Sequence, residues 1–375
     1  MGIWEKPPAA LLDRLGEVFG FEPPRAYGWD TVESIAAMRD GKGKVFFALG
    51  GNFAAATPDT YETWKALRRC DLTVHVTTKL NRSHVVHGRE ALILPCLGRT
   101  EIDIQAGGPQ GVTVEDSMSM VHISTGINPP ASEHLLSEPA IVARLAAATI
   151  GHSSNTPWLW LIEDYTRIRD KIEAVFADFK DFNERVAVPG GFRLRNTASE
   201  RVWATATKKA TFVAHAVPRD TPSHRARARF AGKGDTVVFT LLTTRSHDQY
   251  NTTIYGHDDR YRGVFGQRRV VFIHEADIRA LGLKDGDWVD IQTVLDDAGD
   301  GAQVRRADRF KLVAYDIPRG NLAAYYPETN PLVPLNSVAL NAGTPASKSI
   351  PVILTPHTAP VAAKADHDAS AYAIG

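Results

Sequence analysis

The sequence predicts an α/β fold in which a βαβ domain is followed by a double-psi β-barrel domain. Apolar runs of strand length alternate with helical patterns in the first half, whereas short strands with glycine-bearing turns dominate beyond Pro189-Gly190-Gly191. With 375 residues, 43% of them hydrophobic, the chain is long enough to bury two cores. We therefore expect an α/β domain over residues 1–186, a β-barrel domain over 187–362 and a disordered tail over 363–375.

The N-terminal domain is expected to open with two short helices within residues 3–43, split by Pro23-Pro24. The apolar run 45–49 then predicts a strand, which Gly50-Gly51-Asn52 links to a helix over 61–69. A strand, a glycine turn and a helix form a βα unit, whose backbone approaches a ligand at the carboxyl end of the strand. A tight turn without any ligand explains the glycines about as well.

Two more strands, at 72–77 and 91–95, precede amphipathic helices within 131–186. Aromatic and aliphatic side chains recur there every three or four residues, which indicates core packing. In the second domain, the 281–289 segment provides a glycine turn of the kind found at barrel corners. Barrel strands are expected at 202–206, 210–217, 236–242, 270–273, 288–293 and 310–315.

The composition argues against several classes of function. Lys plus Arg and Asp plus Glu number 43 each, so net charge favours neither nucleic acid nor an anionic membrane as a partner. Basic clusters at 225–229 and 267–269 are local candidates for contact with a phosphate-bearing ligand. Two cysteines cannot supply the four thiolates of an iron–sulfur cluster. Neither a transmembrane run nor a secretion signal is evident, so we expect a cytoplasmic protein.

The most informative stretch is a polar loop that follows the apolar strand pattern at 236–242. It contains Thr243, Thr244, Arg245, Ser246, His247 and Asn251. A second loop of similar chemistry follows the strand at 72–77 and contains Thr77, Thr78, Lys79, Asn81 and Arg82. Hydroxyl, amide and cationic groups at strand ends suit a multiply charged ligand such as a phosphorylated heterocycle. For either loop alone, the alternative is a solvated turn that satisfies its own backbone groups.

Four longer strings resemble one branch of a known family. They are TKLNRSH at 78–84, ILPCLGRTE at 93–101, VEDSMSM at 114–120, and the 317–334 segment with its Pro-Glu-Thr-Asn motif. With these strings and the Thr-x-Arg loop, the chain resembles the formate dehydrogenase-like alpha subunits of the molybdopterin guanine dinucleotide oxidoreductases. The resemblance implies that the βαβ dinucleotide-binding domain and the barrel hold molybdopterin guanine dinucleotide, as Mo-bis-MGD. The cofactor-binding residues that it implies are Gly50, Gly51, Asn52, Thr77, Thr78, Lys79, Asn81, Arg82, Thr243, Thr244, Arg245, Ser246, His247, Asn251, Asn330 and Lys348.

The resemblance covers only the C-terminal half of the family's oxidoreductase. In the family, the molybdenum ligand and the iron–sulfur cluster belong to the N-terminal half, so no residue here is assigned a catalytic or metal-binding role. The resemblance implies a separate or missing N-terminal half as partner, a small-molecule substrate, and an isolated chain without activity. The alternatives are a non-catalytic cofactor-binding accessory protein or inert truncated remnant, and a generic nucleotide-binding α/β protein.

His84-x-x-His87 with Cys96 nearby also has the residue types of a zinc site. A fourth ligand is not evident, so we favour a loop without metal. Cys70 lies at the end of an expected amphipathic helix, where buried packing is its expected role.

Overall fold

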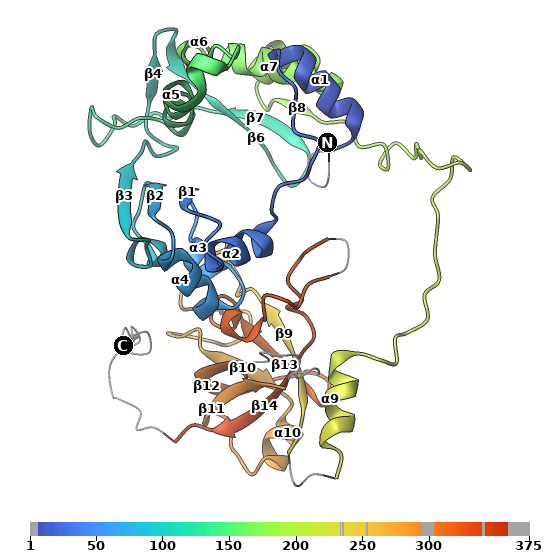
Figure 1. The fold of residues 1–375 in the computed structure, drawn as a ribbon. Coiled ribbons are helices and arrows are strands. Elements are labelled where there is room, and N and C mark those ends of the chain that lie inside the picture. The colour runs from blue at the N-terminus through green and yellow to red at the C-terminus, as the bar shows by residue number, and fades with distance from the viewer. Residues whose placement is uncertain are drawn as a thin grey trace.

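A computed structural model of the chain describes residues 7–232, 234, 236–252, 254–294, 304–339 and 342–358. The expected tail at 363–375 lies outside these residues. The predicted fold class, an α/β domain followed by a double-psi β-barrel, is confirmed (Figure 1). In the described part of the chain, no helix has both the length and the apolar character needed to cross a membrane.

The predicted βαβ unit is present and carries a parallel sheet. Its three strands lie in the order β1-β2-β3, and the shared core beside them includes Phe46, Trp64 and Leu67. A capping box between Asp30 and Glu33 starts the second helix. The elements are α1 (Ala9–Phe19), α2 (Thr31–Arg39), β1 (Val45–Leu49), α3 (Phe53–Ala56), α4 (Thr60–Arg68), β2 (Leu72–Thr77), η1 (Arg82–Val85) and β3 (Glu90–Pro95).

Small antiparallel sheets and a helical layer follow. The predicted aromatic stripe packs as a core, in which Phe179 and Phe182 contact Phe192. The strands are β4 (Asp103–Gln105), β5 (Gly108–Gln110), β6 (Val112–Glu115), β7 (Met120–Ser124) and β8 (Phe192–Arg193). The helices are α5 (Glu138–Ile150), η2 (Gly151–Ser153), α6 (Trp158–Glu163), α7 (Thr166–Val175), η3 (Ala177–Phe179) and α8 (Phe182–Ala187). Because β8 pairs with β7, residues just beyond 186 still pack with the N-terminal part, and the division at 186/187 stays a prediction.

The strands predicted at 202–206 and 210–217 are wrong. Neither a helix nor a strand occurs between β8 and α9 (Pro222–Phe230), and Figure 1 shows this segment as a long extended connection. Phe212 is 95% exposed and Val217 85% exposed. An apolar and β-branched pattern becomes a strand only where a neighbouring strand pairs with it, and none lies beside this segment.

The barrel closes in the order β10-β12-β11-β14-β9-β13. The β10–β12 and β13–β9 pairs are parallel, whereas the other four are antiparallel. Inward-facing side chains, among them Phe239, Leu241, Ile291 and Phe310, fill it completely. Its elements are β9 (Phe239–Thr244), β10 (Val270–Ile273), α10 (Glu275–Ala280), β11 (Trp288–Thr293), β12 (Arg306–Ala314), β13 (Asn321–Tyr325), η4 (Asn330–Leu332) and β14 (Ile350–Pro356). The sequence predicted β9 to β12 and missed β13 and β14.

Candidate functional site

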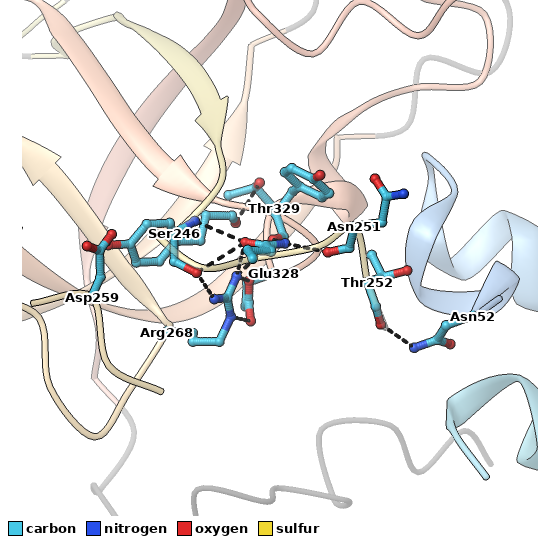
Figure 2. Close-up of polar contacts among 11 residues, drawn as sticks. Asn52, Ser246, Asn251, Thr252, Asp259, Arg268, Glu328 and Thr329 are labelled. Atoms are coloured by element: carbon cyan, nitrogen blue, oxygen red, sulfur yellow. Dashed lines mark hydrogen bonds and ion pairs between the residues drawn. The ribbon is translucent and has the colours of Figure 1, made fainter. Parts of the chain in front are cut away.

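The Gly50-Gly51-Asn52 turn and the polar loop after β9, about 200 residues apart in sequence, meet in the structure. Asn52 is buried at the start of α3, and its Nδ2 donates to the carbonyl of Thr252 at 3.3 Å. The neighbouring Asn251 accepts a hydrogen bond of 3.1 Å at Oδ1 from Arg245 Nη2. Figure 2 shows Asn52 reaching from the α/β domain towards the barrel loop at Thr252. The turn after β1 and the loop after β9 therefore lie beside each other.

The first turn is shaped by backbone geometry. Gly50 and Gly51 both have positive φ, 68° and 74°, a conformation that glycine adopts at lower cost than residues with a Cβ. Asn81 donates through Nδ2 to the carbonyl of Gly51 at 2.7 Å, which ties the turn after β1 to the loop after β2. Ser83 donates to Asn52 Oδ1 at 3.2 Å and fixes the orientation of that amide. The turn therefore presents an ordered strip of backbone beside the barrel loop.

The loop after β9, which we call the barrel loop (residues 245–252), is bonded by Arg268. The sequence placed Arg268 in a basic cluster for ligand phosphates. That interpretation is wrong for Arg268, because its side chain is 4% exposed and forms an ion pair with Glu328 at 2.7 Å. It also donates to Ser246 Oγ at 2.6 Å, to Gln249 Oε1 at 2.9 Å and to the carbonyl of Tyr326. Figure 2 shows this guanidinium among the loop residues that it bonds. Its role here is to position the loop.

A buried carboxylate fixes the other side of the loop. Asp259 is 1% exposed and accepts from the backbone N–H of His247 at 3.1 Å, from Tyr325 Oη at 2.7 Å and from Arg262 at 2.6 Å. Burial opposes the ionisation of Asp259, but these hydrogen bonds hold its pKa below the usual value. Burial and the neighbouring carboxylate raise the pKa of Tyr325, which stays a neutral donor. Sequence reasoning missed Asp259, which no local pattern marks, and did not connect Arg268 of the basic cluster with Glu328 of the Pro-Glu-Thr-Asn motif.

Two cations lie close together at the barrel edge. Lys348 Nζ donates to the carbonyl of Thr243, while Arg245 donates through Nε to Tyr326 Oη at 2.8 Å. Partial desolvation lowers the pKa of Lys348, and the charge of Arg245 lowers it further. Because the charge that acts on Lys348 is a like charge, an anion bound here would stabilise both side chains.

The other sequence-predicted residues occupy several environments. Thr77 caps its own loop by donating to the carbonyl of Lys79 at 2.8 Å, and Thr78 and Lys79 are exposed. Arg82 lies over the Trp64 ring, and the ring of His247 is tilted against that of Tyr261, with the ring centroids 3.8 Å apart. Thr243 is buried, and Thr244 is half-buried.

Asn330 does not lie open to a ligand through its amide nitrogen. Its Nδ2 donates to the carbonyls of Ala55 and Ala56 at 2.8 and 3.1 Å, at the end of α3. The side chain is buried and joins the barrel to the α/β domain. The structure therefore gives Asn330 a positioning contact, and its contact with a cofactor stays a prediction.

His84, of the His84-x-x-His87 pair considered for zinc, orders its own loop. The ring of His84 packs against that of His75 at 5.0 Å, and its Nδ1 accepts from the Asn81 N–H, which orders the loop after β2. Burial lowers the pKa of His75, as do His84 and His87. Within the described ranges, no three His, Cys, Asp or Glu side chains are grouped to hold a metal. Cys70 is buried in a hydrophobic core, as predicted, and Cys96 is also buried.

Residues 239–358 match the family model described as the Molydopterin dinucleotide binding domain. This stretch contains the whole barrel and the loop that meets Asn52. The chain therefore has a molybdopterin dinucleotide-binding domain in its C-terminal part. The match places Arg245, Asn251, Asn330 and Lys348 inside the molybdopterin dinucleotide-binding domain, together with the buried Arg268 that positions its loop.

The relatives that resemble the chain are longer than it is. It is 52% identical over 357 residues to the Uncharacterized oxidoreductase Rv2900c of Mycobacterium tuberculosis, covering 95% of this chain and 44% of the relative. It is 46% identical over 356 residues to Protein YdeP of Escherichia coli, covering 95% and 45%. The chain thus spans less than half the length of these relatives.

A solved structure shares the fold that includes the molybdopterin dinucleotide-binding domain. Acetylene Hydratase from Pelobacter acetylenicus aligns with a TM-score of 0.59 and 15% identity, covering 93% of this chain and 50% of that one. The α/β domain and the barrel therefore recur together in a larger protein.

Proposed function

We propose that the chain binds molybdopterin guanine dinucleotide as the C-terminal part of a molybdenum oxidoreductase of formate dehydrogenase type. The dinucleotide-binding family supports the pterin dinucleotide, and the oxidoreductase names of the relatives support the reaction class. The guanine base and the formate-type branch rest on the strings at 78–84, 93–101 and 114–120. The cytoplasmic location and the partner half are part of the same proposal.

The residues present fit such a ligand. A pyrophosphate requires N–H donors and cations, and the converged loops bring the Gly50-Gly51 backbone, Arg245 and Lys348 to one region. The observation that carries the proposal is the contact of Asn52 with Thr252, which brings the glycine turn of the α/β domain to a loop of the dinucleotide-binding domain. When bound, the cofactor supplies the redox chemistry, and this chain binds and orients it.

The proposal predicts which side chains hold the cofactor. We expect Arg245→Met to lower the retained pterin at least tenfold, because a charge-assisted contact to phosphate is lost. The exposed Arg260 lies nearby in the same domain, so Arg260→Met is the matched control and should retain the wild-type amount. The measurement is the pterin and nucleotide content of chain purified from a bacterium that makes molybdenum cofactors, quantified by mass spectrometry. Pterin without guanosine would contradict the guanine form, and an adenine nucleotide without pterin would contradict the proposal.

A second prediction concerns pH. The lowered pKa of Lys348 means that its ammonium loses its proton below the usual 10.5, and an anion favours the protonated form. The affinity for inorganic pyrophosphate should therefore fall by about tenfold as the pH rises through the folded-state pKa of Lys348. Calorimetric titrations of wild type and Lys348→Met check this, since their difference removes the titration of pyrophosphate itself. If the affinity for pyrophosphate changed with pH in the same way in both proteins, Lys348 would not contact the anion.

A further inference from the structure

One face of the parallel β1-β2-β3 sheet is apolar and exposed. The pairing register places Val45, Phe47 and Leu49 of β1 on the same face as Leu92 and Leu94 of β3. Their exposed fractions are 62%, 36%, 46%, 50% and 37%. The valines of β2, Val74 and Val76, lie between them on the same face but are buried, with 6% and 1% exposed. We call the five exposed residues the open sheet face.

The opposite face of the sheet is covered over β1 and β2. Phe46 of β1 packs into the core built by Ile35 and Met38 of α2 and by Trp64 and Leu67 of α4. Figure 1 shows α2, α3 and α4 gathered beside the three strands. Helices therefore cover β1 and β2 on this side, whereas the open sheet face exposes large side chains to solvent.

Topology explains why this chain covers only one face. The strands lie in sequence order, so right-handed connections from β1 to β2 and from β2 to β3 run on the same side of the sheet. Parallel sheets are normally covered by helices on both faces. The helices for the second face must then come from polypeptide outside β1 to β3, as in doubly wound folds.

We infer that the open sheet face docks amphipathic helices of the polypeptide that the longer relatives carry in addition to the region matched here. Those relatives resemble this chain over 95% of its length, yet the match covers only 44% of Rv2900c. More than half of that relative thus lies outside the match and is available to pack against the matched region. A contiguous exposed apolar face is the kind of surface on which such polypeptide docks. This inference does not depend on which cofactor is bound.

Single cysteines test the inference. Leu92 and Ile93 are neighbours in β3 with similar exposure, 50% and 44%, but they lie on opposite faces. The native Cys70 and Cys96 are buried, and burial raises the pKa of both thiols, so their background reaction with a maleimide is slow. The Leu92→Cys and Ile93→Cys chains would each be labelled alone, and again when co-expressed with the part of Rv2900c that the match leaves out.

We expect the partner to slow labelling of Leu92→Cys at least tenfold and to leave Ile93→Cys unchanged. Leu92→Asp should abolish co-purification, whereas Ile93→Asp should not, with circular dichroism confirming that both variants fold. Absence of association, or equal labelling at both positions, overturns the inference. Protection of Leu92→Cys that grows with the concentration of the chain alone also overturns it, because a second copy would then be the occupant.

Discussion

Replacing Arg268 with Met is expected to lower the free energy of unfolding by about 3–5 kcal/mol and to make the barrel loop more mobile. The guanidinium is almost fully buried and donates to Ser246, Gln249, Tyr326 and Glu328. Without it, the Glu328 carboxylate stays largely buried with no counter-charge, and the loop loses its main support. Urea denaturation and hydrogen exchange at the Ser246 amide, which donates to Gln249, measure the two effects.

The ion pair and the loop contacts can be separated. The double variant Arg268→Met with Glu328→Gln removes both charges, so it should recover part of the stability that the single variant loses. It should not restore the slow exchange at Ser246, because the donor to that loop is still absent. Arg260→Met, on an exposed arginine, should change the free energy of unfolding by no more than about 0.5 kcal/mol and should leave the exchange at Ser246 slow. If the single and double variants were equally stable, the ion pair would not be the source of the effect.

Local pattern accounts for what the sequence predicted correctly. The apolar run before Gly50-Gly51-Asn52 and the polar residues after β2 and β9 are local signals, and each marked an element that the structure contains. Parallel strands bring their carboxyl ends to one edge of a sheet, so the contact of Asn81 with Gly51 follows from the βαβ pattern. The contact of Asn52 with Thr252 does not follow, because it joins two domains.

Elements defined by distant partners were missed. β14 begins Ile350-Pro351, and a proline normally argues against a strand paired on both sides. It forms because β9 and β11 flank it along different parts of its length. Arg268 was misread for the same reason, since its partner Glu328 is 60 residues away and no local pattern connects them. A cluster of basic residues indicates an anionic ligand only when no acidic side chain of the protein already neutralises it.

Replacing Asp59 with Asn is expected to loosen the α/β domain from the barrel and to cost about 3–5 kcal/mol of stability. Asp59 precedes α4 and bonds Arg305 of the barrel through both oxygens, at 3.0 and 2.6 Å. It also accepts from the Leu335 N–H at 3.2 Å, and its own N–H donates to the Asn330 carbonyl at 3.1 Å. One residue thus joins three barrel segments to the domain that carries Asn52.

Asn is the informative replacement at this position. The φ of Asp59 is 49°, a left-handed conformation that Asn adopts readily, so the backbone is retained while the charge and one of the two acceptor oxygens are removed. The matched control is Asp13→Asn, whose partner Arg25 is exposed and whose loss should cost less than about 1 kcal/mol. The urea midpoint and the exchange rate of the Leu335 amide provide the readouts. Asp59 joins the barrel to the domain that carries Asn52, so cofactor retention should fall with stability in Asp59→Asn. Equal urea midpoints for Asp59→Asn and Asp13→Asn would show that other contacts hold the domains together.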